Sequence, residues 1–148
     1  MNAVAESQPS FVIGQFRAGQ LPESVLAKAR AQIGRALEHV GGADVDDMLG
    51  GVLMLVYEAD DLDTLVATLA VGLEQWREEN GQGRTALTVF AVGGESFWEW
   101  SGTVQRALED MAREHGADSI RAIARPGMGK WLQRLGYGEL AHVMEWRG

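Results

Sequence analysis

The stretch from Thr85 to Tyr137 constrains the fold more than any other part of the sequence, because it contains two apolar segments joined by a long helical segment. Ala86–Val92 is a short apolar run of β-forming residues that ends at Gly93-Gly94. Ser119–Ala124 predicts a second strand. A strand, a helix and a second strand of the same sheet form a crossover unit, in which an anion or a cofactor can bind at the glycine turn and helix start.

The helix inside this unit is predicted to begin at Ser96, with Glu99 three residues later. This spacing is typical of a capping box, in which each side chain accepts a hydrogen bond from an otherwise unpaired backbone N–H. Gly116 is predicted to end the helix. A helical stripe of apolar residues connects the two ends, comprising Phe97, Val104, Leu108, Met111 and Ala112.

After the second strand, Arg125-Pro126-Gly127 predicts a break in the chain and Lys130–Leu135 a short helix that ends at Gly136. Thr64–Leu73 fits helix and strand equally well by periodicity, and the short turn before it favours a strand. The other predicted elements are a helix over Leu21–Val40, a short helix over Val45–Leu49, strands over Val52–Tyr57, Arg84–Val92 and His142–Trp146, and a turn at Glu78–Gly83. This order predicts an α+β sandwich, with helices on both faces of one mixed, mainly antiparallel sheet.

A chain of 148 residues fits a single domain, predicted over residues 21–148, preceded by a tail or docking arm at residues 1–20. Within that arm, Phe11–Phe16 fits an edge strand or a docking segment. The net charge of −8 argues against nucleic acid or an anionic membrane as a partner. Without cysteine the chain has no thiolate chemistry, and neither a signal peptide nor a spanning segment is evident, so we expect a cytoplasmic location. A homo-oligomer is compatible with the sequence.

The order of elements and several short motifs resemble the GNAT acetyltransferase superfamily over about Leu21 to Trp146. Ala112-Arg113 followed by Gly116 resembles the end of that family's central helix, and Leu135-Gly136-Tyr137 resembles its leucine-glycine-aromatic motif. With Gly93-Gly94, a tryptophan at the next helix start and the Lys130-Trp131 pair, the combination is most similar to GNAT-like proteins of tailed phages and prophages.

The resemblance implies that the turn after the fourth strand holds the pyrophosphate of acetyl-CoA. The corresponding segment runs through Val92, Gly93, Gly94, Glu95, Ser96 and Phe97. It has two glycines, but it lacks the family's basic residue and spacing, and it carries the acidic Glu95. The family's general-acid tyrosine would stand at Leu132, which cannot donate a proton. These departures favour a degenerate, non-catalytic protein that acts through contacts with a phage or host protein and needs no cofactor.

Two alternatives remain open at this point. One is an acetyl-CoA-dependent N-acetyltransferase with a variant cofactor loop, and the other is a small-ligand binding module that uses the same cleft. An opening between the fourth and fifth strands would favour these alternatives, whereas a cleft plugged by Phe97, Trp98 or Trp131 would favour the non-catalytic interpretation.

Individual residues carry competing interpretations. The glycine turn could bind an anion, or it could simply be a tight turn with a capping box. Arg125 and Lys130 could bind a phosphate or a carboxylate, or they could be solvated surface cations. An exposed Trp100 would indicate a partner-binding surface, since tryptophan is enriched at binding hot spots. No histidine has the spacing of a metal motif, so no metal site is predicted.

Overall fold

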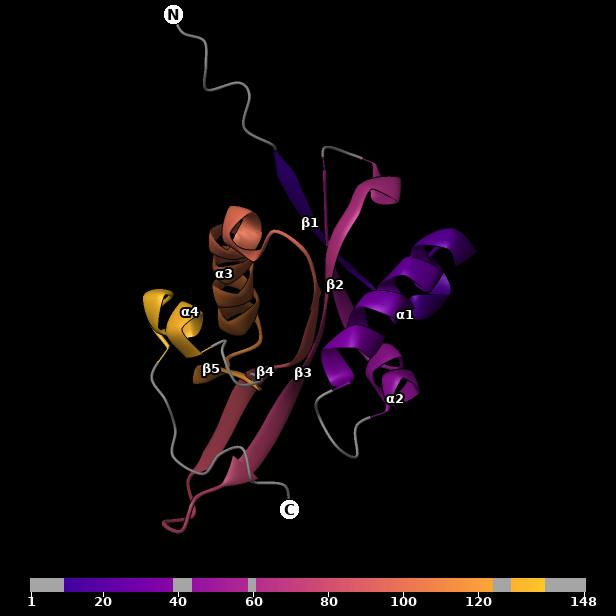
Figure 1. Cartoon of the computed structure of the whole chain (residues 1–148). Coiled ribbons are helices and arrows are strands. Elements are labelled where there is room, and N and C mark those ends of the chain that lie inside the picture. The colour runs from indigo at the N-terminus through magenta and orange to yellow at the C-terminus, as the bar shows by residue number, and fades with distance from the viewer. Residues whose placement is uncertain (1–9, 39–43, 59–60, 124–128, 138–148) are drawn as a thin grey trace, which may run out of the picture.

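The computed structural model of the chain describes residues 10–38, 44–58, 61–123 and 129–137. In this part of the chain, one sheet has the order β1-β2-β3-β4-β5 (Figure 1). The strands are β1 (Phe11–Phe16), β2 (Val52–Glu58), β3 (Leu65–Arg77), β4 (Gly83–Gly94) and β5 (Ser119–Ala122). The first four pair antiparallel and β5 pairs parallel to β4, which confirms the predicted mixed, mainly antiparallel sheet.

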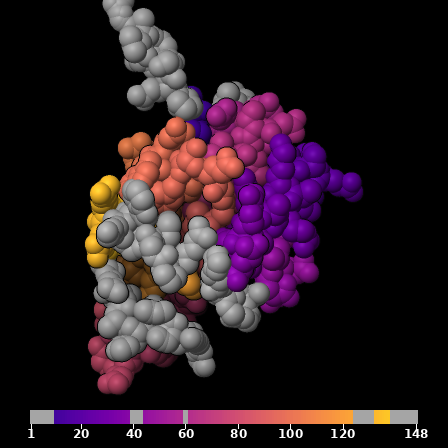
Figure 2. Space-filling view, in the orientation of Figure 1, coloured from indigo at the N-terminus to yellow at the C-terminus, as the bar shows by residue number. Residues whose placement is uncertain are grey.

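Helices cover both faces of this sheet, as predicted (Figure 1). On one face lie α1 (Glu23–Leu37) and α2 (Val45–Leu49), and on the other lie α3 (Phe97–Glu114) and α4 (Gly129–Arg134). Each face has its own buried apolar cluster, one under α3 and one under α1 and α2. The space-filling view shows α3 and α4 on the opposite side of the molecule from α1 and α2 (Figure 2).

A stripe of apolar residues fixes α1 on the sheet. Val25, Ala29 and Ile33 recur at helical spacing and are almost completely buried. Pro22 is the residue just before the helix, which begins at Glu23. α1 approaches β4 so closely that a Cβ added at Gly93 would lie 2.0 Å from the backbone oxygen of Gln32.

The ambiguous segment at Thr64–Leu73 forms a strand, which confirms the sequence-based choice. β3 begins at Leu65 and extends to Arg77, beyond the predicted end. It pairs with β4 through a hairpin whose turn includes Gly81 at a φ of +85°. Before β3, the short 3-10 helix η3 (Leu62–Thr64) is capped by the Asp61 side chain, which accepts a hydrogen bond from the Asp63 N–H at 2.9 Å.

The remaining sequence predictions meet different outcomes. Phe11–Phe16 is the edge strand of the sheet, and it is followed by the 3-10 helix η2 (Ala18–Gln20). β5 ends at Ala122, before the predicted Ala124, and the predicted strand at His142–Trp146 lies outside the described residues. No helix in the described part of the chain is long and apolar enough to cross a membrane.

The predicted capping box at the start of α3 is wrong. Ser96 has a φ of +57° in the left-handed region, and its side chain makes no capping hydrogen bond. The helix begins at Phe97, one residue later than predicted. We attribute the missing capping box to a contact with β3. The Glu95 N–H donates a hydrogen bond to the Val66 carbonyl at 3.2 Å, and this bond fixes the turn against the strand just before the first residue of the helix.

Candidate functional site between β4 and β5

The two neighbours of β4 pair with it over very different lengths. β3 pairs with β4 from Arg77 opposite Gly83 to Ala67 opposite Gly94. β5 pairs only from Ala86 opposite Ser119 to Val89 opposite Ala122. One further bond, from the Ile123 N–H to the Val89 carbonyl at 3.0 Å, closes this seam. Beyond Val89, no described strand pairs with this side of β4, so the sheet opens there.

A β-bulge lies at the point where the opening begins. Ala70 and Val71 of β3 are opposite Ala91 and Val89, so Phe90 is the extra residue of β4. A bulge bends its strand and strengthens the local twist. We infer that the bulge turns the end of β4 away from β5 and so contributes to the opening.

A cavity of about 130 Å³ lies in this opening between β4 and β5. The buried apolar residues Leu69, Val104 and Leu108 form part of its inner wall. Its rim includes Gly94 and Ile123, and the Ile123 side chain is 48% exposed. The other lining residues are Ala36, Leu37, Val89, Phe90, Ala91, Val92, Phe97, Trp100, Ser101, Gln105, Ala122, Leu132, Leu135 and Tyr137. The cavity is therefore an apolar space that reaches the surface at the ends of β4 and β5.

Few polar side chains face this cavity. The Tyr137 hydroxyl donates to Gln105 Oε1 at 2.9 Å, and Gln105 Nε2 donates to Glu109 Oε2 at 3.1 Å. This chain of hydrogen bonds ties the segment after α4 to α3. Ser101 also lines the cavity, and it is only 4% exposed. Its hydroxyl makes no hydrogen bond to any residue that the structure describes, whereas the buried Thr68 and Thr88 both donate hydrogen bonds.

Tyr137 is the ionisable residue among the described residues that line the cavity. Burial raises the pKa of Tyr137 above its ordinary value. The hydrogen bond with Gln105 lowers the pKa, and the nearby charge of Glu109 raises it further, but burial is the largest effect. The phenol therefore keeps its proton at neutral pH.

The structure separates the residues of the predicted anion turn. Gly93 faces α1, and Gly94 has a φ of +144° with its α-carbon against β3, where a Cβ would lie 2.4 Å from the Val66 oxygen. Close packing thus explains both glycines without a ligand. Val92, Gly94 and Phe97 line the cavity, whereas Glu95 is exposed.

Trp100 does not lie on a surface. Its side chain is 2% exposed, and its Nε1 donates to the Glu95 carbonyl at 2.6 Å. The ring packs edge-on against Phe97, with the centroids 5.1 Å apart. This burial contradicts the interpretation of Trp100 as a partner-binding residue, because the hydrogen bond and the core contacts already use the ring. Trp98, at 42% exposure, is the exposed tryptophan of this turn.

Two predicted ligand-binding cations are not placed in the site. Arg125 lies outside the described residues, and Lys130 belongs to the first turn of α4, but its side chain is not described. Leu132 lines the cavity, at the position where the resemblance implies an acid. Sequence reasoning missed Ser101, Gln105 and Tyr137. Tyr137 was visible only as the end of a motif, and Ser101 gave no signal because a single serine within a helix has no distinctive pattern.

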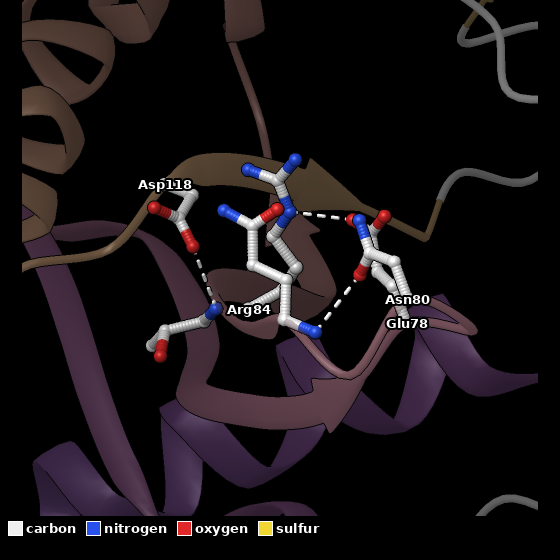
Figure 3. A network of polar contacts seen from close by, with 6 residues as sticks. Glu78, Asn80, Arg84 and Asp118 are labelled. Carbon is white, nitrogen blue, oxygen red and sulfur yellow. Dashed lines mark hydrogen bonds and ion pairs between the residues drawn. The ribbon is translucent and has the colours of Figure 1, made fainter.

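A second hollow, lined by both charged and apolar residues, lies beside the β3–β4 hairpin. Its charged residues Glu78, Arg84 and Asp118 make contacts within the chain. Arg84 Nε donates to Glu78 Oε1 at 2.5 Å, and Asp118 Oδ2 accepts from the Thr85 N–H at 2.9 Å (Figure 3). Asn80 closes the turn by accepting from the Gln82 N–H at 2.8 Å (Figure 3). Among the described residues, no group of His, Cys, Asp or Glu side chains could hold a metal ion. The apolar cavity is therefore the stronger candidate for a functional site.

Comparison with solved structures supports the fold, whereas comparisons with family models and curated proteins found no match. Three matching solved structures cover most of this chain. A tetramutant of the BH1408 protein from Bacillus halodurans matches with a TM-score of 0.63 and 11% identity, covering 86% of this chain and 94% of that one.

The other two structures are N-acetyltransferases. The aminoglycoside N-acetyltransferase AAC(6')-Iy in complex with CoA has a TM-score of 0.62 and 12% identity, covering 95% of each chain. Glucosamine-6-phosphate N-acetyltransferase from Arabidopsis thaliana has a TM-score of 0.60 and 15% identity, covering 89% of this chain and 94% of that one. The chain therefore has the GNAT acetyltransferase fold.

Proposed function

We propose that this protein is an acyl-CoA-dependent N-acyltransferase with a variant cofactor turn. The observation that carries the proposal is the apolar cavity at the point where β4 and β5 separate, next to the start of α3. The fold likeness to N-acetyltransferases, one of them bound to CoA, supports the same assignment. Fold alone does not define function, so the proposal depends on the cavity as well as on the fold.

The residues present fit a thioester cofactor in three respects. The apolar cavity suits the acyl end of the molecule. Beyond Val89, the side of β4 with which no described strand pairs offers backbone groups to the cofactor's amides. The start of α3 carries the positive end of a helix dipole beside the exposed Gly94 and Ser96, which suits phosphate groups. When bound, the cofactor would supply an acyl group activated as a thioester.

The chain itself would contribute positioning, exclusion of water and a proton. The apolar inner wall at Leu69, Val104 and Leu108 excludes water from the acyl end. Tyr137 holds a proton on its hydroxyl at neutral pH, because burial raises its pKa. In the proposed transfer the amine nitrogen would bond to the acyl carbon and release its proton to water, while the carbon–sulfur bond breaks. Tyr137 is the described residue of the cavity that could give the departing sulfur a proton, and it would regain that proton from water.

The non-catalytic interpretation has less support. Its protein-contact surface depended on Trp100, which is buried. Nothing in the comparisons links the chain to phage or prophage proteins. Phe97 forms part of the cavity wall without filling the cavity, and Trp98 is not among the lining residues. The side chain of Trp131, the third residue predicted as a possible plug, lies outside what the structure describes. The cytoplasmic location, the oligomeric state and the domain limit at residue 21 stay predictions.

Isothermal titration with acetyl-CoA tests the proposal directly. Ile123→Glu places a carboxylate at the rim of the cavity, and we expect it to weaken binding at least about tenfold through repulsion of the phosphates. Leu73→Glu is a matched control, because Leu73 is 45% exposed, lies on β3 and does not line the cavity. Heat from the wild type and from the control, with loss in Ile123→Glu, would support the proposal.

Turnover separates an enzyme from a binding module. The chain contains no cysteine, so a thiol reagent detects released CoA without a background from the protein. A panel of primary amines is tested as acceptors, including aminoglycosides and hexosamines. Binding of acetyl-CoA without thiol release for any amine would identify a binding module, and absence of binding would overturn the proposal.

A further inference from the structure

Among the residues that the structure describes, Ser101 is the buried polar residue of the cavity without a hydrogen-bond partner. Its hydroxyl makes no hydrogen bond to any residue that the structure describes, although the residue is only 4% exposed to solvent. A buried hydroxyl without a partner lowers folding stability, because it loses its hydrogen bonds to water and gains none in the protein. Buried polar groups in native proteins are normally paired, so an unpaired one that faces a cavity indicates a partner that comes from a ligand.

The residues around Ser101 indicate the chemical class of that ligand. The cavity walls around it come from the buried apolar residues Leu69, Val104 and Leu108 and from Trp100. A water molecule held here would need two to four polar partners. The fitting ligand is instead mainly aliphatic, with one polar atom that accepts a hydrogen bond.

Resting on the function proposed above, we propose that this cavity binds an aliphatic acyl chain longer than acetyl, and that Ser101 Oγ donates a hydrogen bond to the acyl carbonyl oxygen. Ser101 then acts as a positioning residue that sets where the carbonyl carbon lies. Its cost in the empty protein is recovered when the ligand is bound, because the hydroxyl gains its missing partner.

The size of the cavity supports a chain longer than acetyl. A cavity of about 150 Å³ lined by aliphatic and aromatic side chains stays dry and accommodates benzene in another protein. The cavity here has about 130 Å³ and a similar lining, so a single methyl group would leave much of it empty. Each buried methylene group strengthens binding by about fourfold, until the space is filled.

Titration with CoA, acetyl-CoA, butyryl-CoA and hexanoyl-CoA tests the chain-length part. We expect affinity to rise from CoA to butyryl-CoA or hexanoyl-CoA by about tenfold or more. Equal affinity for CoA and for all three acyl forms would overturn this inference and leave the proposed function standing. No binding of CoA in any form would overturn both.

Ser101→Ala tests the hydrogen bond. We expect it to bind butyryl-CoA about threefold to tenfold more weakly than wild type, with free CoA affinity unchanged. The variant should unfold at the same temperature as wild type or higher, since it removes an unpaired hydroxyl. Ser24→Ala, at an exposed position of α1, is the control for a serine substitution in a helix. Unchanged butyryl-CoA affinity in Ser101→Ala would overturn the assignment.

Infrared spectroscopy gives a readout that a structural role would not change. With a carbonyl-labelled butyryl thioester, hydrogen bonding lowers the carbonyl stretching frequency, and Ser101→Ala should reverse that shift. A second variant, Ala122→Leu, narrows the cavity and should shift the preference back toward acetyl-CoA. Ala107→Leu is its control, because Ala107 packs against the same core cluster without lining the cavity. The same chain-length preference in both variants would contradict the proposed acyl position.

Discussion

The two sides of β4 differ in how completely they are closed. On the β3 side, the pairing runs from Gly83 to Gly94, and α1 lies against Gly93 with no room for a Cβ. On the β5 side, the pairing of β4 with β5 stops at Val89. A cavity follows, and it contains the buried Ser101 hydroxyl, which has no hydrogen-bond partner among the described residues. On the β3 side, glycines and paired polar groups serve close packing. The candidate functional site therefore lies on the β5 side. The predictions below test this division, from the largest expected effect to the smallest.

The largest effect is expected on the open side, at Trp100. Trp100→Ala removes a buried ring and the hydrogen bond to the Glu95 carbonyl, so it should lower the free energy of unfolding by about 3–5 kcal/mol. Urea denaturation measures the change. Trp98→Ala is the matched variant at an exposed position, where we expect about 1 kcal/mol or less. Equal losses for the two would show that Trp100 is not the anchor of this turn.

Gly93→Ala should break the closed side. The new Cβ would lie 2.0 Å from the Gln32 oxygen, so α1 must shift away from β4, and we expect a loss of about 3 kcal/mol in the free energy of unfolding. Gly102→Ala in α3 is the control, since nothing lies within 4 Å of its added Cβ and alanine favours a helix by about 1 kcal/mol. If both variants gained stability in the same urea assay, α1 would not lie as close to β4 as described.

Thr68→Val sharpens the contrast between paired and unpaired hydroxyl groups. Thr68 Oγ1 donates to Gln32 Oε1 at 2.7 Å, and Gln32 Nε2 donates to the Val66 carbonyl at 3.1 Å. Valine leaves Gln32 Oε1 buried without that donor, so we expect a loss of about 1–2 kcal/mol by thermal or urea unfolding. Ser101→Ala on the open side should show no such loss. A loss of equal size in both variants would mean that Ser101 has a structural partner.

The smallest effect concerns the pH dependence of stability at Tyr137. The pKa of Tyr137 is raised in the folded state from its ordinary value of 10.0, so the folded chain keeps this proton where the unfolded chain releases it. The stabilisation is fully present below that ordinary value and is lost as the pH rises through the raised pKa. Urea titrations between neutral pH and about pH 11 should therefore show a decline in stability that Tyr137→Phe reduces. Tyr57→Phe should retain the decline, and an unchanged slope in Tyr137→Phe would contradict the burial effect.

Much of the fold could be predicted from local patterns. Local patterns predicted the helix over Leu21–Val40 that contains α1, and the apolar run before Gly93-Gly94 predicted the end of β4. The capping box failed even though its spacing was correct, because the bond from the Glu95 N–H to Val66 on β3 fixes the turn in another geometry. Spacing along a chain contains no information about a contact with a strand far away in the sequence.

The candidate site was predicted only in outline. Of the predicted turn from Val92 to Phe97, the residues Val92, Gly94 and Phe97 line the cavity, but the two glycines serve packing. The polar side chains that line the cavity are Ser101, Gln105 and Tyr137, which the sequence did not single out. A tryptophan every second residue does not reveal which ring is buried. Trp100 and Trp98 differ in exposure because only Trp100 points toward the Glu95 carbonyl and the core.

The sequence by itself determined the order of helices and strands and hence the mixed sheet with helices on both faces, because periodicity and turn residues act over a few neighbouring positions. Only the tertiary structure decided where β4 and β5 separate, why Gly93 must be glycine and which polar side chain faces the cavity. Each of these depends on contacts between segments that are distant in the chain, such as Gly93 with Gln32 and Tyr137 with Gln105. Such contacts form when the layers pack together, so no local pattern records them.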